Sequence, residues 1–131
     1  MVIVLDSSVL IAVERGELML EAISQQFRGL DVAISALTAA ELLHGVHRAV
    51  KKRQRDRRES FVESMIALYP ILPYDLSAAR VHARLWAQLA ESGIGIASHD
   101  LLIAASALSV DGAVVTRDRR SFPRIPASLP T

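Results

Sequence analysis

The chain has 131 residues, of which 51% are hydrophobic, and its formal net charge is +1. This length predicts one domain with a substantial core, so residues 1–131 are expected to form a single domain. The absence of cysteine excludes disulfides, thiolate metal sites and cysteine nucleophiles. No signal peptide is visible, and no apolar stretch approaches the roughly 20 residues that span a bilayer, so we expect a cytoplasmic protein without membrane contact.

Short apolar runs rich in β-branched residues alternate with helical patterns along the chain. Three of these runs are typical of buried parallel strands, at residues 2–5, 32–35 and 113–116. A fourth, at 71–74, contains Pro73, which cannot donate to a ladder and therefore predicts a strand at the sheet edge. The proline-rich tail after Phe122 is expected to end as an extended edge segment or to fray.

Six helical patterns lie between the strands, and several of them end at a glycine. They cover residues 9–14, 18–27, 38–50, 57–68, 76–91 and 100–110. In the fifth pattern Val81, Leu85 and Leu89 recur at four-residue steps beside Trp86, an apolar stripe typical of a core or a dimer surface. Strands that alternate with helices predict an α/β domain with a mostly parallel sheet.

Carboxylates recur where these strands and helices join. Asp6 directly follows the first strand, and Asp118 comes two residues after the strand at 113–116. Glu41 and Asp100 are expected in the first turn of a helix, at the end that faces the same edge of the sheet. Because ligand groups gather outside the carboxyl ends of parallel strands, we expect the four side chains to converge.

Three of the four acids also have a structural explanation. Thr38 and Glu41 have the spacing of a capping box. Asp100 suits a helix N-cap and Asp118 suits a turn, whereas Asp6 has no such role. Carboxylates that converge repel one another and have raised pKa values unless a cation compensates them. The set as a whole therefore favours a metal site over separate structural roles.

An all-oxygen site in a chain without cysteine favours Mg²⁺ or Mn²⁺ over zinc. Such ions activate water and stabilise the charge that grows on a phosphodiester, so the acids predict nuclease chemistry. Three histidines lie inside helical patterns and are expected to be packing or surface residues: His44, His47 and His82. His99 adjoins Asp100 and is expected either to begin a helix or to touch substrate.

Four segments resemble the acidic motifs of PIN-domain ribonucleases, particularly VapC-type toxins. They are "VIVLDSSVLI", "ISALTAAELLHGV", "SHDLLIAASAL" and "VVTRDRRSF". The resemblance runs from residue 1 to about residue 126, nearly the whole chain. It implies a three-layer α/β/α PIN-like fold with a mostly parallel four- to five-stranded sheet. It also implies Mg²⁺- or Mn²⁺-dependent endoribonuclease activity on RNA, a homodimer, and a cognate antitoxin that occupies the active site.

The resemblance also assigns roles to individual residues. It places the four catalytic and metal-binding acids of the family at Asp6, Glu41, Asp100 and Asp118. Ser8 matches a hydroxyl that steadies the first aspartate, and Thr116 matches a polar residue at the end of the fourth strand. Ser121 departs from the family, because many members carry another acid or polar residue just before the equivalent of Phe122. This departure leaves open whether one or two metal ions act.

Seven of the 15 Lys and Arg residues lie in one short run. They are Arg48, Lys51, Lys52, Arg53, Arg55, Arg57 and Arg58. Such a run forms either a solvated helix face or a polyanion-binding surface. Its nearness to Glu41 favours contacts with RNA phosphates. We expect Arg48, Lys51, Lys52, Arg53 and Arg55 to make them.

Three other functions are compatible with parts of the pattern. A haloacid-dehalogenase-like phosphatase needs a second aspartate where this chain has Ser8, and a response-regulator receiver needs an acidic pair where it has the single Asp6. A catalytically silent domain of the same fold, binding RNA or an antitoxin, is the third. Metal-dependent cleavage of RNA separates that domain from the nuclease.

Overall fold

A parallel β-sheet forms the centre of the molecule. The computed structural model describes residues 1–96, 98–117 and 129–130, and in these ranges the strand order is β3-β2-β1-β4-β5 with every neighbouring pair parallel. The strands are β1 (Val2–Leu5), β2 (Asp31–Ser35), β3 (Ile71–Leu72), β4 (Ala113–Thr116) and β5 (Leu129–Pro130). The predicted α/β class is confirmed, and the strand that contains residue 71 lies at the sheet edge as expected.

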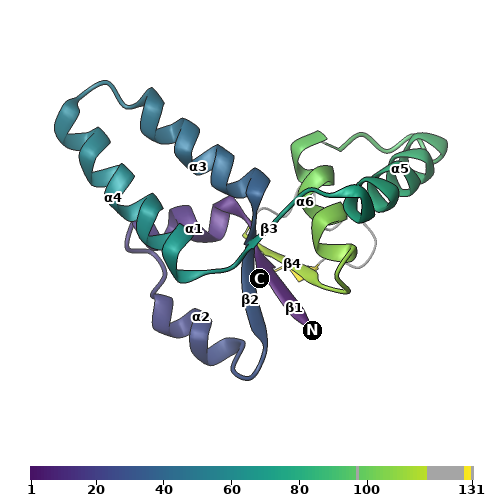
Figure 1. Ribbon diagram of the computed structural model, residues 1–131, viewed down its shortest axis with the longest axis horizontal. Helices are drawn as coiled ribbons and strands as arrows, with labels where there is room; N and C mark the ends of the chain where they lie inside the picture. Colours follow the sequence, from purple (N-terminus) through teal and green to yellow (C-terminus); the bar gives the residue numbers. More distant parts are fainter. Residues whose placement is uncertain (97, 118–128, 131) are drawn as a thin grey trace.

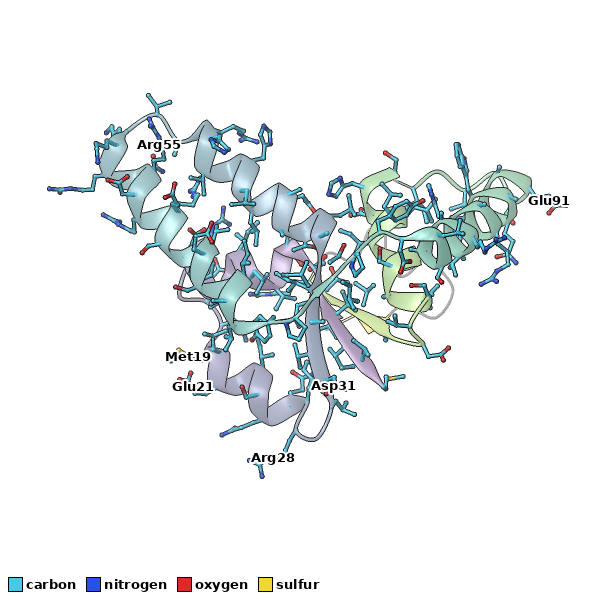
Figure 2. The ribbon with its side chains drawn as sticks, in the orientation of Figure 1. Met19, Glu21, Arg28, Asp31, Arg55 and Glu91 are labelled. Carbon is cyan, nitrogen blue, oxygen red and sulfur yellow. The ribbon has the colours of Figure 1, made fainter. Side chains whose placement is uncertain are left out.

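Helices cover both faces of this sheet (Figure 1). They are α1 (Ser7–Glu14), α2 (Leu20–Gln26), α3 (Ala36–Arg48), α4 (Lys52–Leu68), α5 (Leu76–Glu91) and α6 (Ser98–Leu108). In Figure 1 the α3–α4 hairpin and α2 lie on one side of the strands, and α5 and α6 lie on the other. Charged side chains such as Arg28, Arg55 and Glu91 stand at the periphery (Figure 2).

The alternation of side chains in β1 explains the three layers. Ile3 and Leu5 belong to a core shared with α1, α2, α3 and α4, whereas Val4 belongs to a second core shared with α5 and α6. Successive residues of a strand point to opposite faces, so a strand buried on both faces is apolar throughout. Within the described ranges, no helix combines the length and the apolar character needed to cross a bilayer.

The start of α3 differs from the prediction. Ser35 is the N-cap, and its hydroxyl accepts a hydrogen bond of 3.0 Å from the N–H of Leu37. Thr38 therefore lies inside the helix, where it is fully buried and its Oγ1 has no hydrogen-bond partner. The capping box of Thr38 and Glu41 is wrong, and Glu41 lies in the second turn rather than the first. The Glu41 side chain therefore does not accept the capping hydrogen bond from the backbone N–H of Thr38 that the capping-box spacing predicted.

Three further helices begin earlier than predicted, and α1 is one of them, since it begins at Ser7 instead of residue 9. α4 begins at Lys52, so most of the basic run lies on this helix instead of in the loop before it. α6 begins at Ser98, which puts Asp100 inside the first turn and not at the N-cap position.

The turn after α6 also differs. Its left-handed residue is Asp111, with φ of 54°, and not Gly112. A Cβ atom on Gly112 would lie 2.8 Å from the carbonyl oxygen of Val2, so the glycine permits a close approach to β1.

Candidate active site

Asp6 lies at the carboxyl end of the central strand. It is 3% exposed and is the N-cap of α1. Its backbone N–H donates a hydrogen bond of 3.2 Å to the carbonyl oxygen of Val115 in β4. β1 lies at the centre of the sheet, with β2 and β3 on one side and β4 and β5 on the other. In open α/β folds, ligands bind outside the carboxyl ends of the strands where the strand order changes direction, and the Asp6 carboxylate lies at this point.

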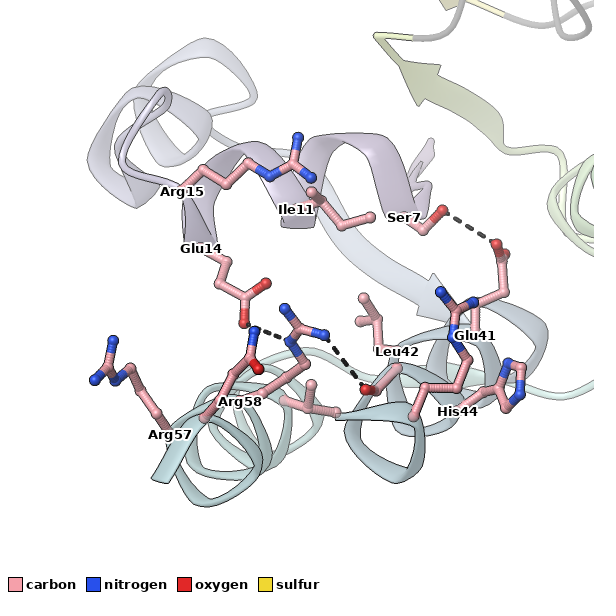
Figure 3. Close-up of a pocket in the computed structure, with 13 residues that line it drawn as sticks. Ser7, Ile11, Glu14, Arg15, Glu41, Leu42, His44, Arg57 and Arg58 are labelled. Atoms are coloured by element: carbon pink, nitrogen blue, oxygen red, sulfur yellow. Dashed lines mark hydrogen bonds and ion pairs between the residues drawn. The ribbon is translucent and has the colours of Figure 1, made fainter. Parts of the chain in front are cut away.

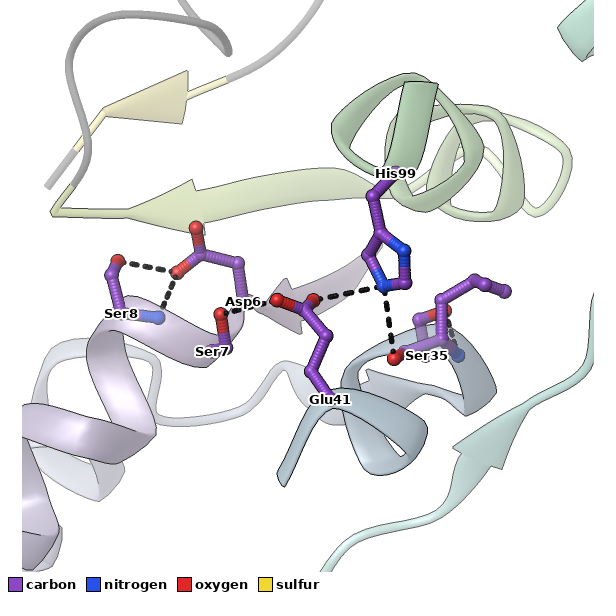
Figure 4. A network of polar contacts seen from close by, with 7 residues as sticks. Asp6, Ser7, Ser8, Ser35, Glu41 and His99 are labelled. Atoms are coloured by element: carbon purple, nitrogen blue, oxygen red, sulfur yellow. Dashed lines mark hydrogen bonds and ion pairs between the residues drawn. The ribbon is translucent and has the colours of Figure 1, made fainter. Parts of the chain in front are cut away.

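Two hydroxyl groups hold the two oxygens of this carboxylate. The Oγ of Ser8 donates a hydrogen bond of 2.6 Å to Oδ1 of Asp6 (Figure 4). The Oγ1 of Thr116 donates one of 2.6 Å to Oδ2. The backbone N–H of Ser8 adds a bond of 3.1 Å to Oδ1. The backbone N–H of Arg117 donates to Ser8 Oγ at 2.9 Å, so the serine hydroxyl is itself held in place. Asp6 therefore has a fixed orientation.

The pKa of Asp6 is raised. Burial is the largest cause, because it disfavours the charged form. Hydrogen bonds from Ser8, Thr116 and Val9 oppose this effect, and the negative charge of Asp100 adds to it. Ionisation of this carboxyl group therefore costs more free energy in the folded protein than in water.

Glu41 reaches the same region from α3. One oxygen, Oε2, accepts a hydrogen bond of 3.3 Å from Ser7 Oγ, and the other, Oε1, lies 3.1 Å from Nε2 of His99 (Figure 4). The same Nε2 lies 3.2 Å from the carbonyl oxygen of Leu37. A carbonyl oxygen only accepts, so Nε2 of His99 carries a hydrogen.

The Oε1 atom of Glu41 is a buried acceptor without a hydrogen bond. The contact with His99 lies within ion-pair distance but lacks hydrogen-bond geometry. Burial raises the pKa of Glu41, the charge of His99 and the hydroxyl of Ser7 lower it, and the charges of Asp100 and Asp6 raise it. An unsatisfied, buried carboxylate oxygen is a position that a cation would stabilise.

Asp100 completes a group of three neighbouring acids. Its charge acts on both Asp6 and Glu41, so α6 brings it to the edge where β1 ends and α3 begins. Among the residues that the structure describes, no group of three or more His, Asp or Glu side chains already stands at metal-ligand spacing. Asp118, the fourth predicted acid, lies outside the described residues, as do Ser121 and Phe122.

The composition of this group suits a hard cation. The three carboxylates are drawn from three elements, the charge of Asp100 raises the pKa values of Asp6 and Glu41, and one oxygen is buried without a donor. Oxygen ligands of this kind are those that Mg²⁺ and Mn²⁺ prefer. The residues present therefore fit a metal ion of this class.

Comparison with known proteins places the chain in a family. The family model described as the PIN domain matches residues 3–128. The chain belongs to the PIN-domain family. Ribonuclease VapC of Rickettsia bellii is 32% identical to it over 95% of this chain and 90% of the relative. Ribonuclease VapC5 of Mycobacterium tuberculosis is 43% identical over 88% of this chain and 82% of the relative.

A solved structure agrees with these relatives. The VapBC-5 structure from Mycobacterium tuberculosis, described as a member of the VapBC family of toxin-antitoxin systems, has a TM-score of 0.77 and 36% sequence identity to this PIN domain. The match covers 99% of this chain and 95% of that one. The resemblance seen in the four acidic motifs is thereby confirmed, together with the PIN-like fold.

Two residues of the site were not anticipated in these positions. Ser7 was not singled out, although a hydroxyl directly after Asp6 is the signal that could have found it. His99 was expected to begin a helix or to touch substrate; it lies in the first turn of α6, and the structure also sets it against Glu41 and Leu37. Both interactions join residues far apart in the sequence, so no local pattern reports them.

A cavity of about 580 Å³ adjoins the acids of this PIN domain, between α1 and the α3–α4 hairpin (Figure 3). Ser7 and Glu41 line one end of it, and arginines line the rest. Of the five residues predicted to bind RNA, Arg48 alone is among its lining residues. Arg55 instead donates to the carbonyl oxygens of Ala49 and Val50 and so fixes the turn between α3 and α4.

Proposed function

We propose that this PIN domain, taken as one unit over residues 1–131, is a metal-dependent endoribonuclease that acts in the cytoplasm as the toxin of a toxin-antitoxin pair. The PIN-domain match and the VapC ribonuclease relatives support the ribonuclease activity. The observation that carries the metal proposal is the meeting of Asp6, Glu41 and Asp100, with a buried Glu41 oxygen that lacks a donor.

The proposed cofactor is Mg²⁺ or Mn²⁺, held by Asp6, Glu41, Asp100 and Asp118. When bound, such an ion lowers the pKa of a water molecule and stabilises the negative charge that develops on the cleaved phosphodiester. Because Nε2 of His99 donates to Leu37, that nitrogen is not a ligand. The set of donor atoms from these four acids consists of oxygen, which favours these ions over zinc.

The residues around the acids would keep them in position for this chemistry. Ser8 and Thr116 fix the two oxygens of Asp6, each through a hydrogen bond of 2.6 Å. Ser7 and His99 approach the two oxygens of Glu41 from α1 and α6. Contacts of this kind orient ligands and tune their basicity, so they support both metal affinity and the geometry of attack.

The proposed substrate is RNA, drawn to the domain by the basic run. Exposed cations on the α3–α4 hairpin, whose first helix carries Glu41, favour a polyanion, since they neutralise backbone phosphates without reading bases. The proposed RNA-binding residues are Arg48, Lys51, Lys52, Arg53 and Arg55. Two of them also have structural contacts, because Lys52 pairs with Asp56 at 2.6 Å and Arg55 fixes the turn before α4. Their contribution to RNA binding is therefore expected to be unequal.

Two protein partners belong to the proposal. The likeness to a VapBC structure supports a cognate antitoxin. The outer face of α5 supports a homodimer, because Leu76 and Trp86 are 67% and 63% exposed and Trp86 stacks on His82. Exposed apolar residues that cluster on one helix are typical of an interface. We expect the chain to sediment as a dimer and Trp86→Arg to sediment as a monomer.

Cleavage of RNA with and without Mn²⁺ tests the function. We expect the unmodified chain to cleave single-stranded RNA only with the metal, and Glu41→Gln to lose this activity. Glu91→Gln is the matched control, because Glu91 is exposed at the end of α5 and lies at the periphery of the molecule (Figure 2). RNA binding without cleavage under any metal would favour the silent binding domain. Equal activity of the two variants would exclude the proposed site.

A further inference from the structure

The cavity between α1 and the α3–α4 hairpin carries an uneven distribution of charge. Its charged lining residues are Arg15, Arg48, Arg57, Arg58, Glu14 and Glu41. Glu14 is paired with Arg58, at 3.7 Å between Oε2 and Nε. Glu41 stands at the end of the cavity that meets the acid group (Figure 3). The remaining part of the cavity therefore has an excess of positive charge from three arginines.

These three arginines differ from Arg58 in the contacts of their side chains. Arg58 donates a hydrogen bond of 3.3 Å to the carbonyl oxygen of Gly45 in addition to its ion pair with Glu14. Arg15, Arg48 and Arg57 are exposed, and their side chains form no hydrogen bond or ion pair within the described part of the chain. Three guanidinium groups around one cavity thus lack a partner of opposite charge.

We propose that this cavity is a binding subsite for RNA backbone phosphates, contacted by Arg15, Arg48 and Arg57, next to the phosphodiester that the acid group cleaves. The inference rests on the proposed ribonuclease function. A planar guanidinium with several donors suits a phosphate better than an ammonium does, because it binds two oxygens at once.

The positions of the residues along α3 fit such a strand. Glu41 and Arg48 lie seven positions apart on one helix, which corresponds to about 10 Å at 1.5 Å per residue. Arg15, just after the end of α1, and Arg57, on α4, also line the cavity. A strand cleaved beside Glu41 would therefore pass within reach of cations on both walls of the cavity.

The lining favours a polyanion over a protein segment. The aliphatic part of the lining is limited to three side chains, Ile11, Leu42 and Val62, and two of them, Leu42 and Val62, are buried. Protein interfaces instead centre on a desolvated apolar patch. An acidic peptide is the competing occupant, and the experiment below separates it from RNA.

A matched set of cations lies outside the cavity and outside the basic run. Arg28, between α2 and β2, and Arg80 and Arg84, on α5, are exposed and do not line the cavity. Replacing either set with glutamine removes three positive charges. The two triple variants therefore have the same net charge and differ in which side chains face the cavity.

Equilibrium binding of a short, labelled oligouridine strand tests the proposal, measured in EDTA over a series of salt concentrations. We expect the triple variant of Arg15→Gln, Arg48→Gln and Arg57→Gln to bind more weakly at each salt concentration. The slope of the logarithm of its binding constant against the logarithm of the salt concentration should become shallower by about 0.7 for each phosphate that is no longer neutralised, or by about 2 for all three. The triple variant of Arg28→Gln, Arg80→Gln and Arg84→Gln should lose much less than half of this slope. Circular dichroism melting verifies that both variants fold.

Several results would overturn the proposal. Equal slope changes in the two variants would mean that the attraction comes from net charge. Loss of binding to polyglutamate, with RNA binding unchanged, would identify a site for an acidic protein segment. No binding of the strand by the unmodified chain would also contradict it. Binding in EDTA needs no cleavage, so a chain that binds as predicted but never cleaves would refute the proposed function and leave the subsite standing.

Discussion

The hydroxyl of Thr116 donates a hydrogen bond of 2.6 Å to Oδ2 of Asp6, and so joins the end of β4 to the end of β1. Both side chains are almost completely buried. Ser8 holds the other oxygen of Asp6 and lies 3.3 Å from Thr116 through its own hydroxyl. The three side chains form a small network that keeps one carboxylate ionisable inside the protein.

Replacing Thr116 with valine should destabilise the protein. The change keeps the shape of the side chain but removes the donor from a buried carboxylate, which costs about 1–3 kcal/mol. Thr38→Val is the matched control, because Thr38 is equally buried and its Oγ1 has no hydrogen-bond partner. Urea unfolding at neutral pH should show a clear loss for Thr116→Val and little change for Thr38→Val. Equal losses would mean that the hydroxyl of Thr116 does not stabilise Asp6.

The stability of the metal-free protein should depend on pH in a definite direction. The pKa values of Asp6 and Glu41 are raised in the folded state, so the folded chain binds more protons than the unfolded chain between the two sets of pKa values. The free energy of unfolding should therefore fall as pH rises from about 4, where free carboxyl groups titrate, through the raised values. Denaturant unfolding in EDTA at a series of pH values measures this fall. Asp6→Asn should reduce it, and a profile unchanged by that substitution would contradict the pKa shift of Asp6.

Replacing His99 with alanine should weaken metal binding. His99 links the first turn of α6 to Glu41 and to the carbonyl oxygen of Leu37, and removal of such a supporting group typically lowers metal affinity by about tenfold or more. His99→Gln should recover part of the affinity, because an amide N–H can donate to Leu37. His47→Ala, an exposed position on α3, is the control. Mn²⁺ titration followed by electron paramagnetic resonance would contradict this role if the two alanine variants bind alike.

Much of this fold follows from the order of patterns in the sequence. Apolar runs and helical spacing predict the strands and helices, because a strand buried on both faces must be apolar throughout. Asp6 is predictable as a site residue because it is a charge directly after such a run, but the expectation that it has no structural role is wrong, since it is the N-cap of α1. The capping box is not borne out, since Ser35 competes with Thr38 for the N-cap and Ser35 directly follows β2.

The parts of the site that sequence reasoning missed depend on contacts between distant residues. His99 and Leu37 are 62 positions apart, and Ser7 and Glu41 are 34 apart. The positions of the cations in the basic run were also only partly predictable from the sequence. Its charge is visible in the sequence, but the helical phase of α4 and the turn held by Arg55 decide which cations face the cavity.

Calorimetric titration of Mn²⁺ into the unmodified chain and into Asp6→Asn tests the central claim most directly. Asparagine keeps the shape of Asp6 and can retain its contacts with Ser8 and Thr116, so the variant should fold. We expect the unmodified chain to bind Mn²⁺ and to melt at a higher temperature with it. In Asp6→Asn, both the binding heat and the rise in melting temperature should be largely lost. Equal Mn²⁺ affinity in the two proteins would contradict the claim that Asp6 holds a metal at the carboxyl end of β1.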